Sequence, residues 1–326
     1  MNNAPTIFNL RPIGGRATIR ISHYIRLHTA VRRCTYLLLA ALLSACATIE
    51  IDLPAITESP TNEHEAGRVV WHDLLTNTPA ASRRFYSELF GWTFERPGIE
   101  LGFGGDDSYM LIRHEGHLIG GMFDVTELRE EQNISQWVTL VATTDIDAAS
   151  DRVVAEGGTV LTRPTALASR GTMGVFRDPA GALFALVQPK GGNPPDIDPV
   201  INGFLWDEAW TDNVASSTAF YSTVLGYAHA DHAIDSSDAT YRVLSVNDKP
   251  RAGVLANPFE GEKPVWVNYL RVQDPASVTA RVEALGGRII INAQARDIGG
   301  MVAFIAGPSG AGIALQTWPI RSEVGE

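Results

Sequence analysis

The sequence predicts an α+β fold in which four βαβββ units pair into two related modules with curved, mixed sheets. Three observations support this fold class: an internal repeat, the same order of strands and helices within each repeat, and a linker rich in proline and glycine. A chain of 326 residues is long enough for about two domains, and 45% hydrophobic residues is ordinary for a chain with a sizeable core.

Tryptophan, glycine and proline residues reveal the repeat. Trp206 follows Trp71 by 135 positions, and Phe220-Tyr221 follows Phe85-Tyr86 by the same number. Farther along, the separation is 129 positions for Trp137 with Trp266, Pro179 with Pro308, and Gly157-Gly158 with Gly286-Gly287. This register predicts a first module over residues 66–190, a linker over 191–200 and a second module over 201–319.

Within the first module, the order of strand, helix and three strands is expected twice. The helix over residues 79–90 begins with Pro79, which suits a first helical position, and Gly91 suits the left-handed residue after its end. A second helix ends before Gly157-Gly158, with Asp145 or Asp147 as its N-cap. Strands are expected at residues 69–75, 92–95, 109–113, 118–123, 137–143, 159–161, 173–177 and 183–188.

The first 45 residues have the composition of an export signal. They contain six arginines and no acidic residue, and Arg32-Arg33 precede a short apolar run from Tyr36 to Leu43. Leu43-Ser44-Ala45-Cys46 resembles the lipobox of bacterial lipoproteins. The resemblance implies a lipoprotein signal peptide over residues 1–45, lipid attachment at Cys46 and a place in the bacterial cell envelope. An ordinary signal peptide is the alternative.

Residues 46–65 are expected to form a polar tether between the lipid and the first module. Without the signal, six arginines are lost, so the chain keeps 20 basic and 37 acidic residues, a net charge of -17. Phosphate backbones repel such a charge, which argues against nucleic acid as a partner. Cys46 is then the one cysteine left, and no internal disulfide is expected.

Two short signatures recur in both modules. The first is Phe-Tyr followed by Gly, at Phe85-Tyr86 with Gly91 and at Phe220-Tyr221 with Gly226. The second closes each module, at Asp178-Pro179-Ala180-Gly181 and Gly307-Pro308-Ser309-Gly310. Paired βαβββ units with these signatures resemble the vicinal oxygen chelate superfamily, which holds glyoxalase I, extradiol dioxygenases and bleomycin-resistance proteins. The resemblance covers nearly all of residues 66–319 and implies a small-molecule ligand.

The metal enzymes of this superfamily hold a divalent ion with His and Glu side chains, so the resemblance implies three ligand positions in each module. These positions hold Trp71, Val138 and Ala185 in the first module, and Trp206, Val267 and Ala314 in the second. Since all six residues are apolar, no cofactor is expected. A bound divalent metal is not excluded, because a slip of one or two residues brings in His72, Asp73, Asp207 and Glu208.

Aromatic residues take the place of the metal ligands. A tryptophan on the wall of a cleft offers a flat apolar surface and one N–H donor, which suits a planar or hydrophobic ligand. The candidate ligand-binding residues are Trp71, Trp137, Trp206, Trp210, Trp266 and Tyr269. The alternative is that these side chains fill the core beneath each sheet.

Each module also has one candidate catalytic acid. Strand alternation places Asp73 on the face of Trp71, and Glu208 on the face of Trp206 and Trp210. An acid in a cleft could bind a cation or act as a general base, whereas a carboxylate at its rim would only be solvated. His114 with His117, in an expected turn, and His229 with His232, on an expected strand, are weaker candidates for a metal.

Two functions follow from these observations. The favoured one is an exported protein that binds a small hydrophobic or aromatic compound in Trp-lined clefts without the usual metal. The alternative is a glyoxalase- or dioxygenase-type enzyme with a displaced metal site, or with metal-free acid–base chemistry at Asp73 and Glu208. A monomer is expected, because four βαβββ units supply the pairings that smaller relatives obtain by dimerising.

Overall fold

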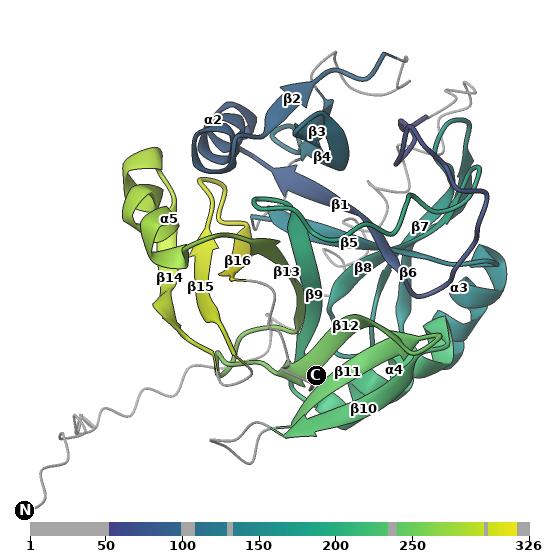
Figure 1. Ribbon diagram of the computed structural model, residues 1–326. Coiled ribbons are helices and arrows are strands. Elements are labelled where there is room, and N and C mark those ends of the chain that lie inside the picture. Colours follow the sequence, from purple (N-terminus) through teal and green to yellow (C-terminus); the bar gives the residue numbers. More distant parts are fainter. Residues whose placement is uncertain (1–51, 99–107, 129–132, 234–239, 297–298, 318–326) are drawn as a thin grey trace, which may run out of the picture. The chain divides into compact units, whose positions relative to one another are not determined.

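A computed structural model describes residues 52–98, 108–128, 133–233, 240–296 and 299–317 (Figure 1). The export signal and the lipid-attachment residue Cys46 lie outside the described residues, so both stay predictions. The described residues all belong to one compact unit, within Cys46–Glu326. In the described part of the chain, no helix is long and apolar enough to cross a membrane.

The strands of the first module form sheet 1, whose order is β2-β3-β4-β1-β5-β8-β7-β6. The sheet is mixed, because β1 is parallel to β4 but antiparallel to β5. All eight expected strands are present, and the sixth is longer than predicted. Their bounds are β1 (Val69–Thr76), β2 (Thr93–Glu95), β3 (Tyr109–His114), β4 (His117–Asp124), β5 (Gln136–Ala142), β6 (Thr159–Leu167), β7 (Gly171–Arg177) and β8 (Leu183–Pro189).

The second module repeats this arrangement in sheet 2, with the order β10-β11-β12-β9-β13-β16-β15-β14. β9 corresponds to β1, because it is parallel to β12 and antiparallel to β13. The strand bounds are β9 (Phe204–Thr211), β10 (Ala228–Ala233), β11 (Thr240–Val246), β12 (Lys249–Ala256), β13 (Val265–Arg271), β14 (Arg288–Ala295), β15 (Met301–Ala306) and β16 (Gly312–Gln316). The predicted fold class of four βαβββ units in two modules is confirmed.

Each βαβββ unit contributes one α-helix after its first strand. The helices are α2 (Pro79–Phe90), α3 (Ile146–Ala155), α4 (Val214–Leu225) and α5 (Pro275–Val282), the last extended by the short 3-10 helix η1 (Glu283–Leu285). Gly91 ends α2 at a φ of 73°, as its position predicts. Of the two candidate N-caps of α3, Asp145 accepts a hydrogen bond from the backbone of Ala148 at 3.0 Å.

Both sheets have a helix-covered face and a helix-free face. The helix-covered faces of the two modules pack against each other, so that α2 lies beside α5 and β14–β16 while α3 lies beside α4 (Figure 1). Phe85 and Tyr86 of α2, for example, share one buried cluster with Ile305 and Ile313 of the fourth unit. The first unit therefore packs on the fourth and the second on the third, which leaves the two helix-free faces pointing away from this core.

Residues 52–57, which we call the N-terminal strap, lie against the helix-free face of sheet 1. Leu53 and Ile56 are 6% and 3% exposed and join the apolar cluster of that face. Asp52 accepts hydrogen bonds from the backbone and hydroxyl of Ser169, at 2.9 and 2.6 Å. The expected polar tether is therefore packed against sheet 1 at residues 52–57. Its side chains Leu53 and Ile56 are buried there in the apolar cluster of the helix-free face.

Candidate functional site

Two buried carboxylates lie at equivalent positions on the helix-free faces, Asp73 on β1 and Glu208 on β9. They are 2% and 0% exposed, so neither is the solvated rim acid of the alternative interpretation. Alternation along each strand brings Asp73 to the face of Trp71, and Glu208 to the face of Trp206 and Trp210, as the sequence predicts.

Asp73 is surrounded by three hydrogen-bond donors. Trp71 Nε1 and Tyr109 OH donate to its Oδ1, each at 2.8 Å, and Arg170 Nη1 donates to Oδ2 at 3.1 Å. A second guanidinium nitrogen of Arg170 donates to Tyr109 OH at 2.7 Å. The guanidinium carbon lies 5.3 Å from the ring centre of Trp71 and 5.5 Å from that of Tyr109, within the range of cation–π attraction.

The N-terminal strap completes the surroundings of Arg170. Arg170 Nε donates to the carbonyl oxygen of Pro54 at 3.0 Å, and the Arg170 side chain has no exposed surface. Leu53 and Ile56 pack in the same cluster as Trp71 and Leu111. The site around Asp73 is thus closed by a part of the chain itself.

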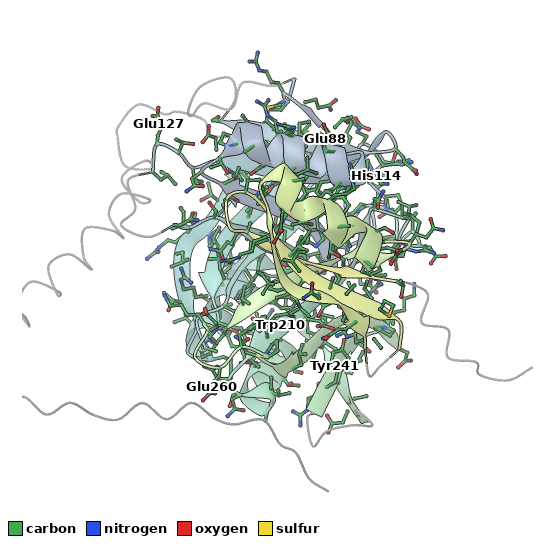
Figure 2. All side chains as sticks on the ribbon, turned by 90° about the vertical axis from the view of Figure 1, so that its left-hand side faces the viewer. Glu88, His114, Glu127, Trp210, Tyr241 and Glu260 are labelled. Atoms are coloured by element: carbon green, nitrogen blue, oxygen red, sulfur yellow. The ribbon has the colours of Figure 1, made fainter. Side chains whose placement is uncertain are left out.

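Glu208 has four donors, two on each carboxylate oxygen. Tyr241 OH and Arg296 Nη2 donate to Oε1 at 2.9 and 2.5 Å, while Trp210 Nε1 and Tyr269 OH donate to Oε2 at 3.2 and 2.5 Å. Trp210 on β9 and Tyr241 on β11 lie in the lower half of Figure 2, away from His114 near its top. The arrangement matches an ionised carboxylate, which only accepts hydrogen bonds.

Arg296 occupies the position that Arg170 has in the first module. Both arginines precede the third strand of their βαβββ unit and bond the carboxylate of the module's first strand. Arg296 Nη1 also donates to Gln316 Oε1 at 2.5 Å, and its guanidinium lies 5.0 Å from the ring centre of Tyr269.

The surroundings of Tyr241, Tyr269 and Arg296 shift the pKa of each of these side chains. Burial disfavours the phenolate, and with the nearby Glu208 it raises the pKa of Tyr241 and Tyr269 well above the usual value. Burial by itself lowers the pKa of Arg296, but attraction to Glu208 and to the two tyrosine oxygens outweighs it and raises that pKa. Arg296 therefore stays a cation while both tyrosines stay neutral donors.

Small residues on the neighbouring strand make room for each site. A Cβ at Gly121 on β4 would lie 1.8 Å from Tyr109 OH and 2.4 Å from Asp73 Oδ1. A Cβ at Gly253 on β12 would lie 2.5 Å from Tyr241 OH. Glycine is needed at both positions because no side chain leaves space for the tyrosine hydroxyl and the carboxylate together.

The two sites differ in what covers them. Around Asp73, Trp71 and Arg170 are fully buried beneath the strap. Around Glu208, Trp206 is half-buried, and its Nε1 donates to Tyr241 OH at 2.9 Å. Several apolar neighbours of Glu208 are also only partly buried, namely Leu205, Leu255, Phe259, Val302 and Phe304. Trp206 at the Glu208 site therefore keeps surface that a ligand could cover, whereas the equivalent Trp71 does not.

The six aromatic candidates do not share one location. Trp71 lies at the Asp73 site, while Trp206, Trp210 and Tyr269 lie at the Glu208 site. Trp137 and Trp266 lie on the helix-covered faces, where they donate to Tyr86 OH and Tyr221 OH at 3.0 and 2.8 Å. For these last two, the structure shows the core packing that was the alternative interpretation.

His72 and Asp207 also face away from the two sites. They are equivalent residues of the two modules, and His72 Nε2 lies 2.9 Å from Asp207 Oδ1 in a buried hydrogen bond between the modules. Asn268 Nδ2 donates to Asp207 Oδ1 and to Thr139 Oγ1, both at 2.6 Å. The slipped ligand set of His72, Asp73, Asp207 and Glu208 is therefore divided between opposite faces of the sheets.

The residues present do not fit the divalent metal that the fold family implies. In the part of the chain that the structure describes, no three His, Cys, Asp or Glu side chains are grouped so that they could hold a metal ion. The helix-free faces carry Trp71, Val138 and Ala185 in one module and Trp206, Val267 and Ala314 in the other. A guanidinium bound to the module's carboxylate is the cation of each site instead.

None of the weaker histidine candidates whose side chains are described belongs to a group of three potential metal ligands. His114, which the sequence places in an expected turn, ends β3, where it is 6% exposed and its Nε2 donates to the carbonyl of Ile201 at 2.7 Å. His117 is exposed at the start of β4, and His229 is exposed on β10. The side chain of His232 lies outside the described residues.

Sequence reasoning missed four residues that complete the sites, Tyr109, Tyr241, Arg170 and Arg296. Tyr241 follows Tyr109 by 132 positions and Arg296 follows Arg170 by 126, so both pairs lie within the repeat but at shifted separations. Each arginine lies shortly before a glycine that opens the next strand region, Gly171 or Gly299. Comparing the modules strand by strand rather than at a fixed offset would have found them.

Two surface hollows lie apart from these sites. One, of about 620 Å³, is lined by Arg83, Arg84, Ser87, Gly91, Trp92, Thr93 and Phe94. The other, of about 390 Å³, is lined by Thr61, Glu63, His64, Glu65, Ala66, Arg68, Asn193, Asp196, Val246, Asn247 and Lys249. Neither borders Asp73 or Glu208, so a ligand at the Glu208 site would rest on its partly exposed side chains or displace them.

Comparisons with known proteins agree with this architecture. A family model described as a glyoxalase-like domain matches residues 69–187. The chain is 31% identical over 261 residues to the anthracycline biosynthesis protein DnrV of Streptomyces peucetius, covering 76% of this chain and 92% of that protein. It is 29% identical over 252 residues to the "Putative glyoxylase CFP32" of Mycobacterium tuberculosis, covering 77% and 94%.

Solved structures of the same fold include a metal-bound glyoxalase and a dioxygenase. A Mn(II)-bound glyoxalase from Novosphingobium aromaticivorans has a TM-score of 0.54 at 17% identity, covering 78% of this chain and 83% of that one. The 2,3-dioxygenase LapB from Pseudomonas sp. KL28 has a TM-score of 0.54 at 15% identity, covering 81% and 96%. At these identities the likeness concerns the fold alone.

Proposed function

Because the chain belongs to the glyoxalase-like family of the vicinal oxygen chelate fold, we propose that it binds a small aromatic or hydrophobic compound at the Glu208 site, without a metal ion. Trp206, Phe259 and Phe304 provide the apolar surface in this proposal. The ion pair of Glu208 and Arg296 fixes the polar side of the site.

One observation carries the proposal: equivalent sites are covered in one module and partly open in the other. Trp71 and Arg170 are buried beneath the strap on sheet 1, whereas the equivalent Trp206 on sheet 2 keeps exposed surface. Partly exposed aromatic side chains beside a few convergent polar groups are typical of small-molecule sites. The name of the relative DnrV adds support, because anthracyclines are compounds with fused aromatic rings.

Binding is favoured over catalysis at the Glu208 site by the hydrogen bonds that Glu208 already accepts. A general base needs a free lone pair directed at the substrate proton. Glu208 already accepts from Trp210, Tyr241, Tyr269 and Arg296. In this proposal Asp73 and Glu208 hold arginines in place rather than act as catalytic residues.

The proposal includes the location. We infer export by the signal over residues 1–45, lipid attachment at Cys46 and a monomer at the bacterial cell envelope. Globomycin, which blocks the lipoprotein signal peptidase, tests the anchor: the precursor should accumulate, and a Cys46→Ala variant should lose the lipid. Normal processing of the precursor in the presence of globomycin, together with normal processing of the Cys46→Ala variant, would contradict a lipoprotein.

Equilibrium dialysis of 2-ethylnaphthalene against residues 47–326 tests the binding itself. Trp206→Ala should weaken binding about tenfold or more, since a buried aromatic side chain contributes roughly 1.5–3 kcal/mol. The matched control, Trp206→Phe, keeps the apolar ring and should bind within about threefold of the wild type. Treatment with EDTA should leave the affinity unchanged. Absence of binding, or equal affinity of the alanine variant, would contradict the proposal.

A further inference from the structure

The first module contains an occupant of its own site. The carbonyl oxygen of Pro54 accepts a hydrogen bond from Arg170 Nε at 3.0 Å. On either side of this carbonyl, Leu53 and Ile56 are buried in the apolar cluster that includes Trp71. The site around Asp73 thus binds a neutral carbonyl oxygen flanked by apolar groups.

Arg296 offers the same donor in the second module. Among the described residues, Arg296 Nη2 donates to Glu208 and Nη1 to Gln316, and its Nε has no such acceptor. The Arg296 side chain is 14% exposed, whereas that of Arg170 is 0% exposed. Within the described residues, no acceptor takes the place in the second module that Pro54 has in the first.

The charge balance favours a neutral oxygen over an anion. Arg296 already forms an ion pair with Glu208, so the pair carries no net charge. The chain beyond the export signal has a net charge of -17, which would repel a carboxylate or phosphate. A ketone, aldehyde or amide oxygen accepts from a guanidinium without this repulsion.

We propose that the ligand of the Glu208 site is a neutral carbonyl compound whose C=O group accepts a hydrogen bond from Arg296 Nε and whose apolar part rests on Trp206 and Phe304. This rests on the proposed function and names its ligand class. Pro54 with Leu53 and Ile56 is the internal example of the same recognition.

Two compounds of nearly the same shape test this inference. 2-Acetylnaphthalene has a carbonyl group where 2-ethylnaphthalene has a methylene group. By equilibrium dialysis against residues 47–326, the ketone should bind about tenfold more tightly, the ratio expected for one hydrogen bond from a charged donor. Arg296→Lys keeps a cation opposite Glu208 but loses Nε–H, so the ratio should fall to about one.

The outcomes separate this inference from the proposed function. Equal affinity of the two compounds for the wild type, with binding still lost in Trp206→Ala, overturns the carbonyl inference and leaves the proposed function standing. No binding of either compound overturns both. A ratio that persists in a folded Arg296→Lys variant also overturns the inference, and the wild-type ratio remains a test if that variant does not fold.

Discussion

Glu208 is the residue on which the arrangement of the second site depends. Its two oxygens connect β9, β11 and β13 through Trp210, Tyr241 and Tyr269, and they hold Arg296 in place. A buried carboxylate of this kind stabilises the fold only while its partners are present, because desolvation makes an unpaired buried charge costly. The residue is therefore structural as well as a determinant of ligand contact.

Glu208→Gln should lower the free energy of unfolding by about 3 kcal/mol, since it leaves the buried Arg296 without a counter-charge. Urea unfolding followed by circular dichroism measures this. The control is Asp231→Asn, which removes one partner of the exposed Arg242–Asp231 pair and should cost less than about 1 kcal/mol. A Glu208→Gln variant as stable as the control would show that the ion pair does not support the site.

The buried tyrosines determine how the stability of the folded protein responds to alkaline pH. Residues 47–326 contain six of them, and burial raises the pKa of every one: Tyr86, Tyr109, Tyr221, Tyr227, Tyr241 and Tyr269. The folded state thus holds protons that the unfolded chain releases near pH 10. The contribution of these tyrosines to the free energy of unfolding is therefore fully present below pH 10 and is lost as the pH rises above it.

Absorbance at 295 nm should show no phenolate in the native protein up to about pH 11. Ionisation should then coincide with loss of the circular dichroism signal, because the tyrosines ionise as the chain unfolds. In 6 M guanidinium chloride all six should titrate near pH 10. Ionisation of several tyrosines at pH 10 in the folded protein would contradict their burial.

At the scale of elements, the N-terminal strap takes the place of a ligand on sheet 1. Two of its apolar side chains are buried, and Pro54 bonds Arg170. Composition alone predicts a polar tether here, because Asp52, Thr57 and Glu58 surround these apolar residues. The burial depends on a tertiary contact with Ser169 and Arg170, more than 100 positions away.

Ile56→Ala should lower the free energy of unfolding by about 2–4 kcal/mol, since it removes a side chain that is 3% exposed. Ile197→Ala is the matched control, because Ile197 is 67% exposed and its truncation should change stability by less than about 0.5 kcal/mol. Thermal unfolding of both variants makes the comparison. Equal stability would mean that the strap does not pack on sheet 1 in solution.

Most elements could be predicted from the sequence because local signals define them. Pro79 and Gly91 bound α2, and alternation along β1 assigns Trp71 and Asp73 to one face. Trp137 is a different case, because strand alternation does not say which face of β5 lines a site. The packing of Trp137 with residues of α2 shows that it belongs to the core. Arg296 was missed because its partner Glu208 is 88 positions away, and because its separation of 126 from Arg170 matches neither fixed separation of the repeat.

At the scale of the whole molecule, buried contacts between the two modules join them into one unit. Phe85 of the first unit packs against Gly287 of the fourth, where a Cβ would lie 2.5 Å from the phenylalanine ring. His72 and Asp207 join the two modules at their centre. Since each module covers the helix-bearing face of the other, the modules should unfold together.

Differential scanning calorimetry should show a single transition for the wild type. Phe85→Ala should lower the stability of this whole transition by about 3–5 kcal/mol, because Phe85 is fully buried between the modules. Val154→Ala, at a side chain that is 56% exposed, should leave it nearly unchanged. Two separate transitions in the phenylalanine variant, one of them at the wild-type temperature, would contradict joint folding.

The site of ligand binding is tested most directly by the indole N–H signals of the tryptophans in a ¹H–¹⁵N spectrum of residues 47–326, assigned by single Trp→Phe variants. On addition of 2-acetylnaphthalene, the signals of Trp206 and Trp210 should shift, while those of the buried Trp71, Trp137 and Trp266 should not. A shift of Trp92, which lines the hollow beside α2, or of Trp71, with Trp206 and Trp210 unchanged, would contradict binding at Glu208.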